Sequence, residues 1–222
     1  MKKVAVIVAA GTGVRMGNNI PKQFLLLQGK AILWHSINAF IKTYNDIEII
    51  MVLPEPFLHE GEKIKEQFLE KANNITLTKG GATRFESVKN GIGFIKDEAI
   101  IFVHDAVRCL VTKSLIQRCY HQAIELGSAI PVINAVDSLR INENDQHKIL
   151  NRNNVKIIQT PQTFLSSILI PAFQQEYHES FTDEATVVEA FGKEVFLCEG
   201  EINNLKITSP IDLVVAENIL TR

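Results

Sequence analysis

The sequence predicts one α/β domain, built on a doubly wound, mostly parallel sheet of the Rossmann-like type with helices on both faces. Four unalternating apolar runs, at 4–10, 47–53, 99–103 and 128–133, are typical of strands that are covered on both sides. Segments with helical periodicity separate these runs. A chain of 222 residues is also close to the upper limit for a single hydrophobic core.

The first run is too short to span a membrane and is expected to be a buried strand. Two of the later segments place apolar residues at helical spacing, namely Leu33, Ile37, Phe40 and Ile41, and then Leu115, Ile116, Cys119, Ala123 and Ile124. Strand and helix therefore alternate through the first 135 residues. In such a fold, ligands bind at the carboxyl ends of the strands.

The pattern changes between about Asn134 and Thr160, where polar stretches separate short apolar pairs. We interpret this segment as an extended hairpin or arm on the single domain of residues 1–222. Helices are expected again from Thr182 to a stop near Gly192. The last helix is expected to begin after Ser209, because a serine cap there precedes a proline at the first helical position.

Charge and composition favour small ligands. The net charge of -2 gives no basic field for a nucleic acid, and no segment resembles a signal peptide or a membrane span. Three cysteines, widely spread and without CxxC spacing, argue against a disulfide framework and against a zinc site. We therefore expect a cytoplasmic protein without nucleic-acid or membrane partners.

A glycine-rich loop follows the first strand and is the most informative segment. In 9–17 and 21–23, amides freed by Gly11 and Gly13 can approach a polyphosphate, and Arg15 and Lys22 can neutralise it. The spacing G-x-G-x-x-x-G is not that of a dinucleotide-binding loop, and no P-loop GK[ST] is present. An alternative is that the glycines only form a turn and the cations are solvated. The position after the first strand favours phosphate binding.

Asp105 follows the run 99–103 and is expected at a strand's carboxyl end beside the glycine loop. A carboxylate there suits Mg²⁺, which binds one or two carboxylates together with substrate phosphates. The alternative is a helix-capping aspartate. We expect His104 to be a packed core residue, because phosphoryl transfer needs positioning more than a proton base.

Six ordered segments resemble the 2-C-methyl-D-erythritol 4-phosphate cytidylyltransferase family and its relatives that act on ribitol 5-phosphate. They are A-A-G-x-G-x-R-M-G with P-K-Q at 9–23, G-G-A-T-R-F-E-S-V at 80–88, H-D-A-V-R at 104–108, T-P-Q at 160–162, T-D-E-A at 182–185 and N-L-K-I-T at 204–208. Six motifs in register are unlikely to arise by chance.

The resemblance implies transfer of CMP from CTP to 2-C-methyl-D-erythritol 4-phosphate, with release of pyrophosphate, in non-mevalonate isoprenoid precursor synthesis. Ribitol 5-phosphate is the alternative acceptor. The implied catalytic cations are Arg15, Lys22 and Lys206, with Mg²⁺ as cofactor. The implied nucleotide-binding residues are Ala9, Ala10, Gly11, Gly13, Gly81, Arg84 and Ser87. Without the resemblance, Arg84 would be expected on the exposed side of a helix beginning near Thr83.

For the acceptor, the resemblance implies the side chains of Asp105, Arg108, Ser138, Arg152, Thr160 and Thr182. It further implies a homodimer with shared sites, in which the neighbouring subunit's arm supplies Arg152 and Thr160. Three departures bear on the acceptor: Ser138 follows a three-residue extension, Asn151 replaces a carboxylate, and Cys109 replaces a proline.

Two other functional classes fit the scaffold less well. A nucleotide-dependent oxidoreductase is disfavoured by the glycine spacing. A non-catalytic CTP-binding protein is disfavoured because Lys22, Asp105 and Lys206 are all present.

Overall fold

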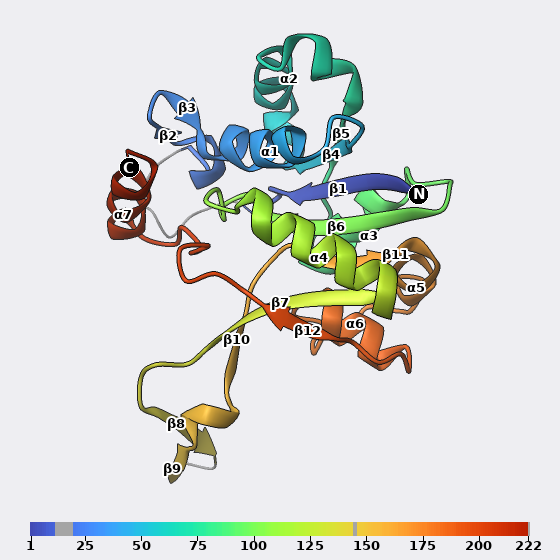
Figure 1. Cartoon of the computed structure of the whole chain (residues 1–222). Helices are drawn as coiled ribbons and strands as arrows, with labels where there is room; N and C mark the ends of the chain where they lie inside the picture. The colour runs from blue at the N-terminus through green and yellow to red at the C-terminus, as the bar shows by residue number, and fades with distance from the viewer. Residues whose placement is uncertain (12–19, 144–145, 222) are drawn as a thin grey trace.

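The computed structural model describes residues 1–11, 20–143 and 146–221. Its centre is a twisted sheet with the strand order β10-β7-β11-β6-β1-β4-β5 (Figure 1). The parallel part consists of β1 (Lys2–Val8), β4 (Glu48–Leu53), β5 (Ile75–Lys79) and β6 (Ala99–Asp105). The mostly parallel sheet predicted from the sequence is therefore confirmed.

The other side of the sheet is mixed. β11 (Gln162–Leu165) runs antiparallel between β6 and β7 (Ser128–Asn134). β10 (Lys156–Ile158) is antiparallel to β7, whereas β12 (Leu197–Glu199) is parallel to it. The sequence pattern did not predict that the chain returns to the sheet as an antiparallel strand.

Helices cover both faces of the sheet, as predicted (Figure 1). One face packs against α1 (Ile32–Thr43), α2 (Leu58–Glu66) and α4 (Lys113–Leu126). The other face packs against α3 (Arg84–Ile92), α5 (Ser166–Ala172) and α6 (Glu184–Ala190). Phe40 and Phe102 meet in the first core layer, and Phe85 stacks on Phe173 in the second.

A third, smaller apolar cluster lies beside this sheet. Here α7 (Pro210–Leu220) packs against the ribbon of β2 (Leu26–Leu27) and β3 (Lys30–Ala31). Ser209 forms a capping box with Asp212 at the start of α7, which confirms the predicted serine cap. Short 3-10 helices lie at Lys22–Phe24, Glu55–Phe57, Leu69–Asn74 and Arg152–Asn154.

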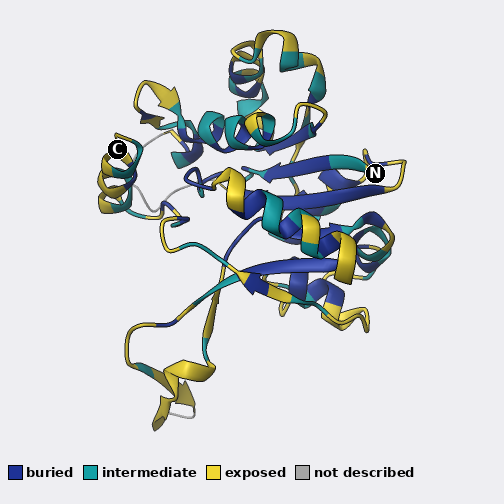
Figure 2. Cartoon of the chain, viewed as in Figure 1, coloured by how far each residue is buried: buried dark blue, intermediate teal, exposed yellow. Residues whose placement is uncertain are grey.

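The predicted arm is a hairpin of β8 (Leu139–Glu143) and β9 (Gln146–Leu150) that projects from the sheet (Figure 1). Figure 2 shows that most of it is exposed, in contrast to the buried strands of the sheet. The chain rejoins the sheet at β10, before Thr160. The described helices include none that is long and apolar enough to cross a membrane.

Candidate active site

The carboxyl ends of β1 and β6 open into a cavity of about 310 Å³. Its lining contains all the described residues that were expected to bind the nucleotide, namely Ala9, Ala10, Gly11, Gly81, Arg84 and Ser87. Lys22, Asp105 and Lys206 also line it. Gly13 and Arg15 lie outside the described residues. The predicted ligand position at the strand ends thus coincides with a cavity.

The register of the sheet explains why these segments meet. Val8 lies opposite Asp105 across the β1–β6 pair, and the N–H of Ala106 donates to the carbonyl of Val8 at 3.0 Å. The neighbouring pair β4–β5 brings Gly80 to the same edge. A Cβ atom at Gly80 would lie 2.4 Å from the Cβ of Ala10, so this close approach requires glycine.

Gln23 fixes the end of β1 and was not singled out by sequence reasoning, although it belongs to the P-K-Q motif. Its buried Nε2 donates to the carbonyls of Ala9 at 2.6 Å and Gly11 at 2.9 Å. The preceding residue, Lys22, then lines the cavity. One residue therefore shapes the loop while its neighbour contributes a positive charge.

Ser87 and Glu86 hold the second loop of the cavity. Ser87 Oγ donates to the carbonyl of Thr83 at 2.9 Å and accepts from the N–H of Gly81 at 3.1 Å. Glu86 accepts from the N–H groups of Ala82 and Thr83, within the capping box of α3. The Ser87 hydroxyl therefore orders the loop backbone, so its contact with a nucleotide stays a prediction.

Three cations surround Asp105, the last residue of β6. Lys206 Nζ lies 2.8 Å from one carboxylate oxygen, Arg84 lies 3.2 Å from the other, and Arg108 Nε is at 3.9 Å. Burial opposes ionisation, but Arg84 and Lys206 outweigh it and hold the pKa of Asp105 well below its usual range. Asp105 is thus ionised, and it is not a helix cap.

Arg84 points inward, toward the cluster. Its guanidinium donates to both carboxylate oxygens of Glu184, one of them at 3.1 Å, and also to Asp105. The alternative placement of Arg84 on the exposed side of its helix is therefore wrong. Burial lowers the pKa of Arg84, but the carboxylates of Glu184 and Asp105 outweigh it and raise the pKa overall.

Glu184 is the first residue of α6 and is fully buried. Burial raises the pKa of its carboxyl, and Arg84 offsets part of this effect. Sequence reasoning assigned no individual role to Glu184. Its place in the T-D-E-A motif was the available signal, but nothing in the pattern indicated a partner in α3.

A second cavity of about 280 Å³ shares Arg84, Asp105 and Lys206 with the first. Arg108, Thr160 and Thr182, which were expected to bind the acceptor, also line it. The shared cluster of charges thus lies between two spaces: one holds the described residues predicted for the nucleotide, and the other holds four residues predicted for the acceptor.

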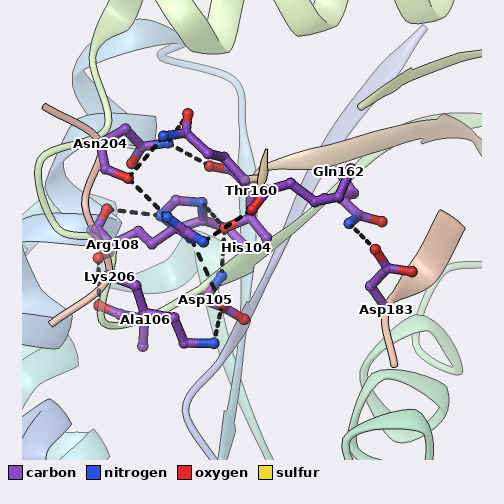
Figure 3. A network of polar contacts seen from close by, with 12 residues as sticks. His104, Asp105, Ala106, Arg108, Thr160, Gln162, Asp183, Asn204 and Lys206 are labelled. Carbon is purple, nitrogen blue, oxygen red and sulfur yellow. Dashed lines mark hydrogen bonds and ion pairs between the residues drawn. The ribbon is translucent and has the colours of Figure 1, made fainter. Parts of the chain in front are cut away.

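Thr160 belongs to its own chain's site, which corrects the expectation that a partner's arm supplies it. The chain has already re-entered the sheet, and Thr160 Oγ1 accepts from the N–H of Asp105 at 3.1 Å (Figure 3). Arg152 and Ser138 remain on the arm and line neither cavity. Arg152 is exposed and donates to the carbonyl of Val136 at 2.7 Å.

His104 is a packed core residue, as expected. Its ring contacts Phe40, Nε2 lies 3.1 Å from the carbonyl of Arg108, and Nδ1 lies 3.0 Å from Thr160 Oγ1. Since a carbonyl can only accept, the proton is on Nε2 and the Thr160 hydroxyl donates to Nδ1. Burial lowers the pKa of His104 to about 4, so the ring is neutral at pH 7.

Three buried amide side chains complete this framework, and sequence reasoning did not assign roles to them. Asn204 donates to the carbonyl of Thr160 at 2.8 Å (Figure 3). Gln159 donates to the carbonyl of Glu201 at 2.8 Å. Gln162 donates to Asp183 at 2.9 Å and accepts from the N–H of Ala185 at 2.8 Å. These bonds fix the segments that carry the site side chains.

The described side chains around the two cavities do not by themselves provide enough ligands for a metal ion. Among the described residues, no group of three or more His, Cys, Asp or Glu side chains is close enough to hold an ion. Asp105 is one carboxylate facing three cations. This arrangement fits only a Mg²⁺ ion that takes most of its ligands from substrate phosphates, so magnesium stays a prediction.

Comparison with known proteins gives a family match along nearly the whole chain. The model of the 2-C-methyl-D-erythritol 4-phosphate cytidylyltransferase family matches residues 3–222. A protein of that name from Phocaeicola vulgatus is 41% identical over 220 residues, covering 99% of this chain and 100% of the relative. Another from Azobacteroides pseudotrichonymphae is 42% identical over 221 residues, covering 99% of both.

Solved structures agree with the sequence relatives. The 4-diphosphocytidyl-2C-methyl-D-erythritol synthase of Anaerococcus prevotii has a TM-score of 0.84 at 25% identity, covering 100% of this chain and 99% of that one. The 2-C-methyl-D-erythritol 4-phosphate cytidylyltransferase of Francisella tularensis has a TM-score of 0.78 at 30% identity, covering 97% and 98%. From motifs, cavity and full-length similarity together, the chain belongs to the 2-C-methyl-D-erythritol 4-phosphate cytidylyltransferase family.

Proposed function

We propose that this chain transfers CMP from CTP to 2-C-methyl-D-erythritol 4-phosphate and releases pyrophosphate, as a step in non-mevalonate isoprenoid precursor synthesis in the cytoplasm. The observation that carries the proposal is the pair of adjoining cavities that share Arg84, Asp105 and Lys206. Two phosphorylated substrates that must react with each other need adjacent sites of this kind.

CTP occupies the first cavity. The backbone of the loop at 80–87 is held in place by Ser87 and lies beside the cytosine base of CTP. A purine base would be too large for this position. Lys22 and Lys206 lie against the triphosphate. Arg15 lies outside the described residues and is assigned as a third cation from its motif alone. These cations stabilise the negative charge that accumulates on the departing pyrophosphate.

The acceptor occupies the second cavity with its phosphate near Arg108, Lys206 and Thr182. One oxygen of this phosphate attacks the α-phosphorus of CTP. A new phosphorus–oxygen bond forms as the bond to the β-phosphate oxygen breaks in line. The attacking oxygen is already anionic, so the reaction needs no general base, consistent with the neutral, buried His104.

Asp105 is the carboxylate that would hold a Mg²⁺ ion bound together with CTP. Such an ion would offset the negative charge of the substrate phosphates.

Dimerisation would complete the acceptor side. The arm exposes apolar side chains, with Val136 at 74% and Ile149 at 75% exposure, and an isolated hairpin is marginally stable in water. A second copy of the chain that packed against the arm would cover these groups. The arm would then place Arg152 and Ser138 at the partner's acceptor cavity.

The test is pyrophosphate release by the purified protein with Mg²⁺, each of the four nucleoside triphosphates, and either 2-C-methyl-D-erythritol 4-phosphate or ribitol 5-phosphate. We expect release with CTP and the methylerythritol acceptor only. Turnover with ribitol 5-phosphate alone would replace the proposed acceptor while keeping the reaction type. Absence of turnover with every pair would reject the catalytic proposal.

A further inference from the structure

Two cysteines that are far apart in the sequence lie side by side, away from both cavities. Cys119 is on α4 and Cys198 is on β12, and their sulfur atoms are 3.8 Å apart. Both are free thiols in this structure. Their wide separation in the sequence, which argued against a disulfide framework, therefore does not keep them apart in the fold.

The elements that carry the pair are already tied together on either side of it. Arg118 donates to the carbonyl of Glu199 at 2.7 Å, and Gln122 donates to the carbonyl of Phe196 at 3.1 Å. α4 lies over the β7–β12 pair, and β12 is a three-residue strand joined to β7 (Figure 1). The two sulfurs are therefore held near each other, and a short strand carries one of them.

The two thiols differ in access and in acidity. Cys119 is fully buried, whereas Cys198 keeps 9% of its surface exposed. The hydrogen bond with Cys119 and the positive charge of Arg118 hold the pKa of Cys198 below its ordinary value, although burial opposes them. The same hydrogen bond and burial raise the pKa of Cys119. Cys198 is therefore the more accessible and the more acidic of the two thiols, and the one that an oxidant would reach first.

We propose that Cys119 and Cys198 form a reversible oxidation site, at which hydrogen peroxide converts the two thiols into a disulfide that links α4 to β12. The Cys198 thiolate attacks one peroxide oxygen and becomes a sulfenic acid, while the other oxygen leaves as water after protonation. The Cys119 sulfur then attacks the sulfenic sulfur and releases a second water. Two thiols lose two electrons and two protons, and one peroxide is reduced to two waters.

Cys109 provides an internal control. It is buried in the separate cluster under α7, and burial raises the pKa of its thiol to about 12. It is therefore a poor thiolate and lies in a different part of the fold. Oxidation should leave Cys109 reduced while the pair reacts. Trypsin would separate the three cysteines, into peptides 109–113, 119–140 and 194–206.

The experiment treats the reduced full-length protein with hydrogen peroxide, or separately with diamide, and then alkylates the remaining thiols. We expect one alkylated cysteine, Cys109, and a cross-linked peptide pair that contains Cys119 and Cys198, which dithiothreitol separates again. Oxidation should also raise the thermal unfolding midpoint, because the cross-link restricts the unfolded chain. Cys198→Ser should abolish the cross-link and the rise, whereas Cys109→Ser should keep both.

The proposal would be overturned if all three cysteines were still free thiols, and were alkylated, after a treatment that fully oxidises free glutathione. Oxidation of Cys198 to sulfinic acid without formation of the disulfide would also overturn it. So would oxidation of Cys109 before Cys119 and Cys198 react. These outcomes are read from the wild-type protein itself, so the test does not depend on the folding of any variant or on the reaction proposed above.

Discussion

Glu184 accepts hydrogen bonds from both terminal nitrogens of the Arg84 guanidinium, although 100 positions of sequence separate them. Arg84 donates to Asp105 as well, and Asp105 is paired with Lys206. Negative and positive side chains thus alternate in a network that runs from the buried start of α6 to the residues shared by the two cavities. Glu184 sets the position of Arg84 without lining either cavity.

Replacing Glu184 should therefore affect both stability and turnover. Glu184→Ala leaves a partly buried guanidinium with Asp105 alone, so we expect a loss of about 2 kcal/mol in the free energy of unfolding. Displacement of Arg84 should lower kcat roughly tenfold to a hundredfold. Urea unfolding and steady-state kinetics measure the two effects. Glu189→Ala, at an exposed position of the same helix, is the matched control. Equal behaviour of the two variants would contradict the positioning role.

Stability should fall at mildly acidic pH because of His104. Its folded pKa is about 4, below the ordinary value of 6.5, so the unfolded chain binds a proton first. The contribution of His104 is therefore complete above pH 6.5 and is lost as pH falls toward 4. For a shift of this size the loss approaches about 3 kcal/mol.

The free energy of unfolding in urea, measured between pH 7 and pH 4.5, tests this sign. We expect His104→Asn to flatten the dependence and His147→Asn, at an exposed position on the arm, to keep it. A His104→Asn variant with the same pH dependence as wild type, or a steeper one, would contradict this assignment.

Lys22 should affect turnover through its positive charge. Its side chain lines the first cavity at the end of the glycine-rich loop, where the pyrophosphate would leave. Lys22→Ala should lower kcat about a hundredfold, since it removes one contact to developing charge. Lys113→Ala, at an exposed position on α4, should retain wild-type kinetics. A near-normal rate for Lys22→Ala would remove this residue from the mechanism.

The elements with strong apolar patterns were predictable from the sequence. β1, β4, β6 and β7, the helices on both faces and the serine cap of α7 follow from local periodicity and capping chemistry, whereas β5 was not among the predicted apolar runs. β11 was not predictable, because a four-residue strand, three of whose residues are buried, has no pattern that gives strand direction. That direction depends on how the chain returns from the arm.

The same limit explains the error at Thr160. A motif gives the residue and its spacing, but it does not tell whether the chain has already re-entered its own sheet. Glu184 was missed for a related reason, since its partner Arg84 lies in a distant helix. Residues that line the strand ends, such as Asp105, were placed correctly because parallel strands end at one edge.

Mixed dimers give the sharpest prediction about Arg152. If the arm of one subunit completes the other subunit's site, Arg152→Ala and Lys22→Ala damage different halves of each site. A heterodimer of the two variants then contains one intact site, formed by the body of the Arg152→Ala chain and the arm of the Lys22→Ala chain. After unfolding and refolding an equal mixture, we expect about a quarter of wild-type activity, since half of the dimers are mixed and each has one working site.

Each variant refolded alone, with the two preparations combined afterwards without exchange, is the control and should show only the sum of the residual rates. A doubly substituted chain, Lys22→Ala with Arg152→Ala, mixed with wild type separates complementation from simple dilution. There the heterodimer pairs an intact body with a damaged arm and a damaged body with an intact arm, so neither of its sites is complete. Only the wild-type homodimers, a quarter of the total, then contribute two working sites each. Recovery in the first mixture that does not exceed its control would mean that Arg152 serves only its own chain.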